Sequence, residues 1–177
     1  MRAIADAARI RRFIEALGRR ARSPGIVYLT GGATAVLHGF RPTTIDVDIK
    51  MDPEPAGAFE AIASLKDELD INVELASPDQ FVPAVPGWQE RSLFIAQHGP
   101  VKFLHYDPIT QALSKIERGD ARDLADVRAL IAAGLVDEKK LVDRFGEIVP
   151  QLPRYPAIDV DAFESKVRAF VGGGEKK

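Results

Sequence analysis

Apolar residues recur along the first twenty positions of the chain at the spacing of a helix. Four of them fall three or four residues apart: Ile10, Phe13, Ile14 and Leu17. This spacing predicts one amphipathic helix over residues 3–20. The segment Ser23-Pro24-Gly25 then breaks the pattern, because proline and glycine both interrupt regular structure. The chain therefore opens with a helix whose apolar side needs a surface to cover.

Short apolar runs and alternating segments after this helix predict the strands of a sheet. Residues 26–29 are apolar throughout, which is typical of a buried strand. Residues 45–49 and 71–75 alternate between apolar and polar, so each is predicted to be a strand with one buried face. In 45–49 the buried face is expected to carry Ile45. Two further strands are expected over 91–97 and 100–105.

Helical patterns fill the rest of the chain. Residues 33–37 and 56–67 are predicted to be helices between the strands. After residue 107 only helices are expected, over 108–118, 120–133, 137–147 and 159–171. The sequence therefore predicts an α/β (α+β) fold, in which a small mixed sheet with flanking helices is followed by a helical C-terminal half.

Four parts of the chain follow from this organisation. Residues 1–22 form a basic N-terminal helix, and residues 23–106 form the α/β core. Residues 107–171 form a helical part expected to pack on that core. Residues 172–177 are rich in glycine and are expected to be a disordered tail.

The composition restricts the class of protein. The 177 residues are 46% hydrophobic and 28% charged, which is ordinary for a soluble globular protein. There are no cysteines, which excludes a disulfide scaffold, a thiolate zinc site and a cysteine nucleophile. No apolar run approaches the roughly 20 residues that span a bilayer. We therefore expect a cytoplasmic protein that makes no membrane contact.

The charge is unevenly distributed along the chain. Residues 1–22 contain seven arginines against Asp6 and Glu15, a balance of +5, so the remainder must carry −7 to give the net −2. A basic helix of this kind is either a solvated surface or a contact for RNA phosphates. The pattern alone leaves both interpretations open.

Two aspartates give the chain its strongest chemical signal. Asp46 and Asp48 lie two apart on a predicted strand, so their side chains share one face, about 7 Å apart. Two such carboxylates can hold a pair of Mg²⁺ ions about 4 Å apart. A third carboxylate on a neighbouring strand would complete the site. Glu74 is the candidate, with Asp70 and Asp79 as alternatives.

The glycines at positions 31 and 32 stand between a predicted strand and a predicted helix. Glycine lets the backbone N–H groups approach a triphosphate, and the helix N-terminus adds favourable partial charge. Thr30 and Thr34 are candidates to add hydroxyl donors. Taken alone, Gly31-Gly32 also fits an ordinary turn, and the two aspartates also fit a solvated strand face. Their occurrence within one short stretch favours a nucleotide site.

This stretch resembles a known signature. Residues 31–50, GGATAVLHGFRPTTIDVDIK, are similar to that of the DNA polymerase β-like nucleotidyltransferase superfamily: glycine, then glycine or serine, a spacer, and Asp-x-Asp flanked by apolar residues. The spacer here has 13 residues. Two positions depart from the pattern. Thr30 stands where an apolar residue is usual, and Gly32 replaces the serine of many relatives, which removes one hydroxyl from the γ-phosphate.

A second resemblance lies in the helical half. Residues 113–127, LSKIERGDARDLADV, resemble a motif of the minimal, AbiEii-like nucleotidyltransferases, some of which are toxins of toxin–antitoxin pairs. The matching residues are Lys115, Arg118, Arg122-Asp123 and Asp126-Val127. The resemblance implies that Lys115 contacts the nucleotide phosphates and that Asp123 lies near the same site. An ion-pair lattice on exposed helices is the alternative.

Together the two resemblances imply a metal-dependent enzyme. It would move NMP from an NTP to a hydroxyl on a tRNA 3′ end, a protein or a small molecule, with two Mg²⁺ ions, or Mn²⁺, as cofactors. Catalysis and metal binding are assigned to Asp46, Asp48 and Glu74. Nucleotide binding is assigned to Gly31, Gly32, Thr34, Lys115 and Asp123. The expected partners are the NTP, RNA at the arginine-rich helix, and a cognate antitoxin protein.

Two other functions remain open. One is a non-catalytic nucleotidyltransferase-like module that binds a nucleotide or a partner, which the absence of a third carboxylate would favour. The other is a nucleic-acid-binding protein that acts through residues 1–22. That protein would bind with a steep salt dependence and would not need the two aspartates.

Overall fold

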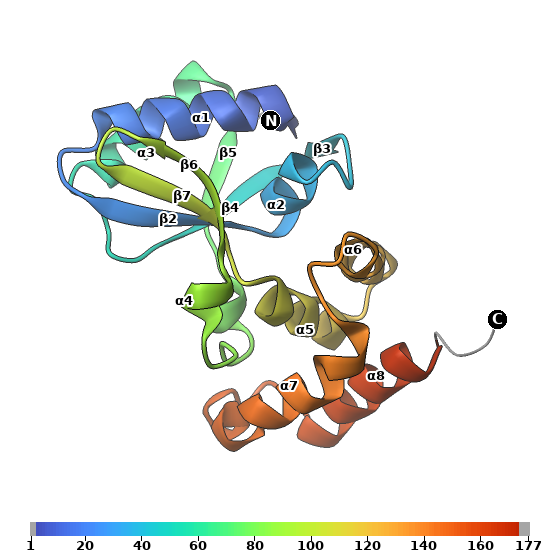
Figure 1. The fold of residues 1–177 in the computed structure, drawn as a ribbon. Helices are drawn as coiled ribbons and strands as arrows, with labels where there is room; N and C mark the ends of the chain where they lie inside the picture. Colours follow the sequence, from blue (N-terminus) through green and yellow to red (C-terminus); the bar gives the residue numbers. More distant parts are fainter. Residues whose placement is uncertain (1–2, 174–177) are drawn as a thin grey trace. The chain divides into compact units, whose positions relative to one another are not determined.

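The computed structural model describes residues 3–173 and divides the chain into two compact units (Figure 1). The first unit holds the chain up to Ser77 together with Ser92–Tyr106, and the second holds Pro78–Arg91 and the chain from Asp107 on. The N-terminal helix is thus part of the first unit. The segment 78–91, which the sequence grouped with the α/β core, belongs with the helical unit.

A mixed five-stranded sheet forms the frame of the first unit. Its strands are β2 (Gly25–Thr30), β4 (Asp46–Met51), β5 (Asn72–Leu75), β6 (Leu93–His98) and β7 (Val101–His105). They lie in the order β5-β4-β2-β7-β6. The pairs β2/β7 and β4/β5 are parallel, whereas β2/β4 and β6/β7 are antiparallel. The predicted mixed sheet with helices is therefore confirmed.

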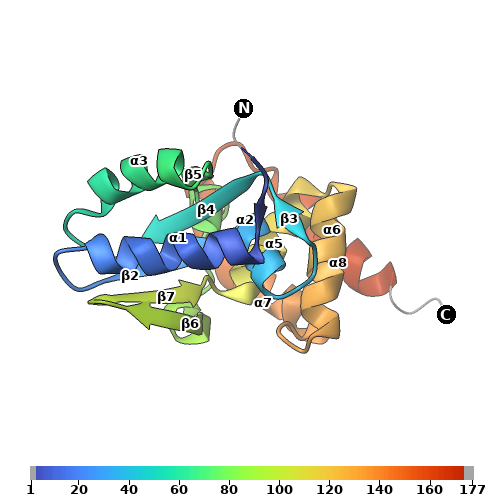
Figure 2. The ribbon, with the colours of Figure 1, turned by 90° about the horizontal axis from the view of Figure 1, so that it is seen from above.

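In the described part of this unit the helices are α1 (Ala7–Arg20), α2 (Gly31–Leu37) and α3 (Ala58–Glu68). Figure 2 looks down on α1, which lies with α3 on one face of the sheet. The predicted helix 3–20 begins later than expected, because the Asp6 carboxylate caps it by accepting a hydrogen bond of 2.8 Å from the Arg9 backbone N–H.

A two-residue strand precedes α1. This strand, β1 (Ala5–Asp6), pairs antiparallel with β3 (Thr43–Thr44) to form a small ribbon. Neither strand was predicted, because two residues are too few to show an alternation in the sequence.

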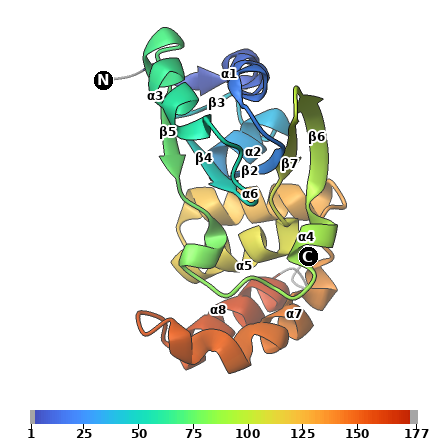
Figure 3. The same cartoon turned by 90° about the vertical axis from the view of Figure 1, so that its left-hand side faces the viewer.

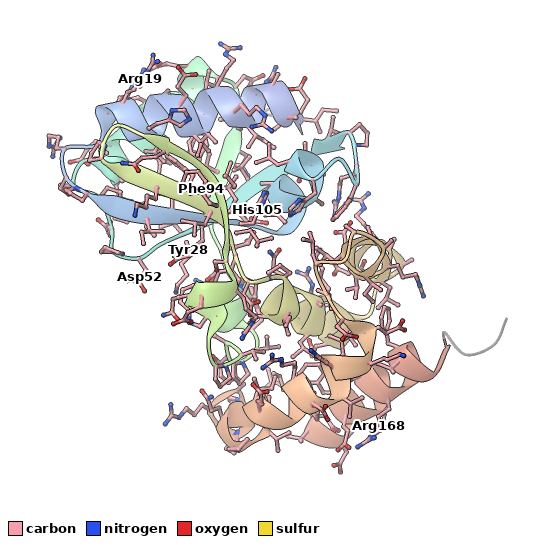
Figure 4. All side chains as sticks on the ribbon, viewed as in Figure 1. Arg19, Tyr28, Asp52, Phe94, His105 and Arg168 are labelled. Carbon is pink, nitrogen blue, oxygen red and sulfur yellow. The ribbon has the colours of Figure 1, made fainter. Side chains whose placement is uncertain are left out.

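The two faces of the sheet differ in what covers them. The odd-numbered residues on β2, β4 and β7 pack with the apolar sides of α1 and α3; the largest of those buried are Leu29, Ile49 and Phe103, and Met51 is partly buried. The even-numbered residues point to the opposite face. Figure 4 shows Tyr28 on this second face, turned away from α1. The alternation along β4 therefore puts both aspartates on the face that α1 and α3 leave open.

One residue of the predicted buried face is exposed. Ile45 has an exposed fraction of 64%. The reason is that β4 begins only at Asp46, so Ile45 lies in the link from β3, outside the ladder that α1 and α3 cover. The expectation of a buried Ile45 was wrong.

The second unit is helical. It contains α4 (Trp88–Arg91), α5 (Pro108–Arg118), α6 (Ala121–Ala132), α7 (Leu141–Ile148) and α8 (Val160–Gly172). Short 3₁₀ turns lie at Pro78–Gln80, Glu138–Lys140 and Val149–Arg154 among its described residues. Figure 3 shows α7 and α8 side by side, and Phe145 of α7 meets Phe163 of α8 edge to face at 4.9 Å between ring centroids.

The long helices of this unit match the sequence prediction closely. The last helix runs one residue further than expected, to Gly172, and Gly173 is its C-cap, so the first two residues of the expected disordered tail belong to this helix end. Residues 174–177 lie outside the described residues. No helix in the described part of the chain has the length and apolar character to cross a membrane.

Candidate nucleotide and metal site

The turn from β2 into α2 approaches the acidic strand closely. Gly31 opens α2 with a φ of +57°, and a Cβ at this position would lie 2.8 Å from Oδ2 of Asp48. The β2/β4 ladder explains the approach, because Asp48 is the register partner of Thr30, the last residue of β2. The structure thus brings Gly31 and Asp48 together, and glycine is required both by the backbone angle and by the carboxylate.

The second glycine makes room for a hydroxyl. A Cβ on Gly32 would collide with Oγ1 of Thr44 and would lie 3.7 Å from Nη1 of Arg41. A larger residue would therefore not fit here, because the Thr44 hydroxyl, which donates a hydrogen bond of 3.0 Å to the Asp46 carbonyl oxygen, occupies the space. Sequence reasoning missed Thr44 and Arg41, because it considered only the length of the spacer in which they lie.

The third carboxylate lies on the strand next to the aspartates. In the parallel β4/β5 ladder, Glu74 is the register partner of Asp48, and Asn72 is that of Asp46. Nδ2 of Asn72 donates a hydrogen bond of 2.6 Å to Oδ1 of Asp46 and one of 3.1 Å to Oε1 of Glu74. Glu74 is therefore joined to Asp46 through an asparagine that the sequence analysis did not single out.

The two alternatives for the third carboxylate lie elsewhere. Asp70 has a φ of +47°, and its Oδ2 accepts a hydrogen bond of 3.2 Å from the Ala3 backbone N–H. Asp79 belongs to the second unit. Only Glu74 of the three candidates is paired in register with β4.

The acids do not converge on one point. Among the described residues, no group of three or more acidic or histidine side chains is placed to hold a metal ion. The contacts give the reason. The Asp48 carboxylate lies at Gly31, whereas Asp46 and Glu74 are both hydrogen bonded to Asn72. The donor set itself suits Mg²⁺, which prefers carboxylate and amide oxygens.

Thr34 does not join this group. It is buried, and its Oγ1 lies 3.1 Å from the Leu29 carbonyl oxygen and 2.8 Å from Nδ1 of His105. Thr30 likewise donates its hydroxyl inward, to the carbonyl oxygen of Ala76 at 3.1 Å. Both threonines therefore secure the β2–α2 turn by contacts within the first unit.

His105 extends the contact of Thr34 into a stack of imidazoles. Its ring lies on that of His38, with centroids 4.0 Å apart and planes inclined by 21°. Figure 4 shows His105 at the end of β7, near α2. Burial lowers the pKa of His105 from 6.5 to about 3, with smaller contributions from His38 and Arg11. The folded protein therefore keeps His105 neutral.

This depressed pKa predicts a loss of stability in acid. The unfolded chain takes up a proton as the pH falls below 6.5, whereas folded His105 does so only near 3. The contribution of neutral His105 to the free energy of unfolding is fully present above pH 6.5 and decreases below it, by up to about 1.4 kcal/mol per pH unit. Urea unfolding between pH 7.5 and 4.5 measures this, and a His105→Gln variant should show a shallower dependence. Equal slopes for the two proteins would contradict the prediction.

Lys115 is enclosed by carboxylates in the second unit. Its Nζ lies 3.0 Å from Oδ1 of Asp123 and 2.7 Å from Oδ2 of Asp126, and all three residues are buried. Arg118 adds a second cation, with Nε 2.8 Å from Oδ2 of Asp123. Asp123 lies in the first turn of α6, where the Asp120 carboxylate accepts a hydrogen bond from its backbone N–H. The structure thus brings Lys115 and Asp123 into one ion-pair cluster, in which the lysine and the aspartates are buried and Arg118 is half exposed.

Of the five arginines on α1, Arg19 and Arg20 pair with acids. Arg20 makes two hydrogen bonds to Glu68 of α3, 2.8 and 2.6 Å long. Arg19 pairs with Glu15 at 2.6 Å. Further along, Arg22 lies 3.8 Å from Glu60. Such exposed pairs add little stability, but they offset charge. These pairs offset part of the positive charge at the C-terminal end of α1 and just beyond it.

The sheet, the glycine turn and the acids of β4 define a domain of the nucleotidyltransferase class. Comparison with known families agrees: residues 7–169 match the family described as nucleotidyltransferase of unknown function (DUF6036). The match spans most of the chain, which therefore belongs to this family. No curated protein and no solved structure matches the chain.

Proposed function

We propose that the protein is a metal-dependent nucleotidyltransferase that moves NMP from an NTP to a hydroxyl acceptor and releases pyrophosphate. The observation that carries the proposal is the contact between Gly31 and Asp48, which puts a helix N-terminus beside an acidic strand. Backbone N–H groups of such a turn bind phosphate oxygens. The acids next to it supply the oxygen ligands that Mg²⁺ prefers.

Each residue of the site has a role in this reaction. Asp46, Asp48 and Glu74 would hold two Mg²⁺ ions, or Mn²⁺, which supply Lewis-acid stabilisation of the developing charge. The turn at Gly31 and Gly32 would orient the triphosphate for in-line displacement. Glu74, as general base or through the metal that it holds, would help to remove the proton of the attacking hydroxyl.

The finer assignments rest on the motif resemblance. We assign the chain to the AbiEii-like branch, with the toxin of a toxin–antitoxin pair as its biological role and an antitoxin protein as partner. The acceptor is a tRNA 3′ end in the cytoplasm, or else a protein or a small molecule. Lys115 and Asp123 would take part in binding the triphosphate. For that, the Lys115 ammonium must exchange a carboxylate for a phosphate, because the two groups that pair with it are both aspartates.

A matched pair of glycine variants tests the proposal. In Gly31→Ala the new Cβ would lie 2.8 Å from the Asp48 carboxylate and displace it. Gly39 also has a positive φ, +79°, but has no atom within 4 Å of the Cβ position, so Gly39→Ala carries the backbone strain alone. Calorimetric titration with each NTP and Mg²⁺ should show at least about tenfold weaker binding for Gly31→Ala, equivalent to about 1.4 kcal/mol.

The NTP affinity of Gly39→Ala shows whether weaker binding by Gly31→Ala comes from the Asp48 contact or from backbone strain alone. Affinity close to wild type in Gly39→Ala, with loss in Gly31→Ala, supports a nucleotide site at the turn. Equal affinities in all three proteins would place the nucleotide elsewhere and refute the proposal.

One observation favours a second candidate function. Because no three acids converge among the described residues, a non-catalytic module that binds nucleotide or a partner protein fits the described side chains equally well. This candidate predicts NTP binding without any transfer, whereas the enzyme predicts both.

A further inference from the structure

A groove lies between α5, α6 and α8 of the helical unit. Its volume is about 690 Å³, within the range of sites that enclose a small molecule. Two helices contribute most of its lining, at positions i, i+4 and i+7 of α6 and i, i+3 and i+4 of α8: Leu124, Arg128 and Ile131, and Lys166, Ala169 and Phe170. At this spacing each helix turns one stripe of side chains to the groove.

Part of the lining is apolar and partly open to solvent. Ile116 is buried, whereas Leu124, Ile131 and Phe170 are only half-buried. Moving such apolar surface from water to contact with an apolar ligand is favourable. The lining therefore suits the apolar body of a bound molecule.

Positive charge prevails around this apolar surface. Among the described residues that line the groove, the cations outnumber the acids: Arg118, Arg128 and Lys166 stand against Glu138. Two of these cations have partners already. Arg118 pairs with Asp123 at 2.8 Å, and Nζ of Lys166 donates a hydrogen bond of 2.6 Å to the Glu117 carbonyl oxygen. The groove is therefore expected to favour an anion.

Arg128 is the cation that lacks an acid opposite it. Its guanidinium carbon lies 5.6 Å from the centroid of the Phe170 ring, and no carboxylate in the described part of the chain pairs with it. A guanidinium over an aromatic ring presents a flat face for stacking and a fork of N–H donors that matches an anionic oxygen pair. Arg128 thus puts an anion-binding group directly beside the apolar lining.

We propose that this groove binds a small amphipathic anion, a molecule with an apolar body and one carboxylate, sulfonate or phosphate group. The body packs against Leu124, Ile131 and Phe170, and the anionic group pairs with the Arg128 guanidinium. The inference is independent of the proposed function, because no residue assigned to the nucleotide and metal site lines the groove.

Two dyes with the same aromatic rings separate charge from apolar contact. Anilinonaphthalene sulfonate carries the anionic group, and phenylnaphthylamine has the same rings without it. Fluorescence titration should show one sulfonate dye bound per chain. Arg128→Gln should bind the sulfonate dye about tenfold more weakly, the value of one charge-assisted hydrogen bond, and the neutral dye as well as wild type does. Inorganic phosphate, which has charge but no apolar body, should not displace the sulfonate dye.

The matched control is an arginine on the other side of α8. Arg168 pairs with Glu164 at 2.7 Å and does not line the groove, and Figure 4 shows it on the side of α8 away from α6. Arg168→Gln should leave the affinity for both dyes unchanged. Ile131→Asp puts a carboxylate among the apolar side chains and should weaken both dyes at least about tenfold. Circular dichroism of each variant verifies its folding.

The pattern of affinities decides the inference. A loss confined to the sulfonate dye in Arg128→Gln supports it. Equal affinities of Arg128→Gln and Arg168→Gln for the sulfonate dye, a loss in Arg128→Gln that the neutral dye shares, or no dye binding by wild type would each overturn it. A dimer in sedimentation that Ile131→Asp dissociates would also overturn it, since a second copy of the chain then covers the groove. None of these results depends on NTP or Mg²⁺, so their failure leaves the proposed function standing.

Discussion

Replacing Lys115 with methionine is expected to lower the free energy of unfolding by about 3–5 kcal/mol, the usual cost of breaking a buried ion pair. Methionine retains the apolar length of the side chain, so the loss comes from the charge. The substitution leaves Asp123 and Asp126, both buried, without the ammonium that lies 3.0 and 2.7 Å from them. Urea unfolding followed by circular dichroism measures the difference.

Two further variants test the cause of this loss. Adding Asp126→Asn to Lys115→Met removes a buried charge and should restore part of the stability, whereas Asp123 keeps its pair with Arg118. Lys139→Met removes a lysine from an exposed position and should change the stability by no more than about 0.5 kcal/mol. If Lys115→Met and Lys139→Met cost the same, the cluster does not stabilise the helical unit.

The same variant addresses the nucleotide. If Lys115 contacts the triphosphate, folded Lys115→Met should bind NTP at least about tenfold more weakly, since each 1.4 kcal/mol is a factor of ten. If the cluster is only a structural link between α5 and α6, the affinity should be unchanged. The sequence could not separate these roles, because a motif records which residues occur and not which charges face each other.

The pattern of apolar residues predicted the layers of the fold well. The buried sides of α1, β2 and β4 follow from spacing alone, because burial imposes a period on each element. On β5 the pattern was right for Val73, but Leu75 of the same expected face is 50% exposed. The pattern gave no prediction for β1 and β3, because a strand of two residues is too short to show a period. It also failed at Ile45, because a pattern does not show where a ladder begins.

The candidate site was predicted in part. Gly31 and Asp48 came from the motif, and the structure puts them in contact. Glu74 came from the alternation of its strand, and the β4/β5 register pairs it with Asp48. Asn72, Thr44 and Arg41 were missed, because each matters through a neighbour distant in the sequence. Thr34 was expected at the phosphates, yet its hydroxyl contacts His105, a residue 71 positions away.

Replacing Asp46 and Asp48 together with asparagine is expected to lower the rate of NMP transfer by at least about 10³-fold, since bound metal supplies several kcal/mol of transition-state stabilisation. Asparagine has the same shape, and its amide oxygen can still accept the hydrogen bond that Asn72 gives to position 46. Stability should therefore stay within about 0.5 kcal/mol of wild type, or rise, because two like charges on one strand face are removed. The measurements are transfer of label from α-labelled NTP to total tRNA and Mn²⁺ binding.

Asp52→Asn is the matched control for this double variant. Asp52 follows β4 directly, is exposed and is labelled in Figure 4, so its loss removes a nearby charge without changing the strand. The metal mechanism requires full transfer and Mn²⁺ binding in Asp52→Asn and neither in the double variant. Full transfer by a folded double variant would refute metal catalysis on β4. NTP binding that survives in the double variant, with no transfer by any of the three proteins, would identify the chain as a non-catalytic member of its family.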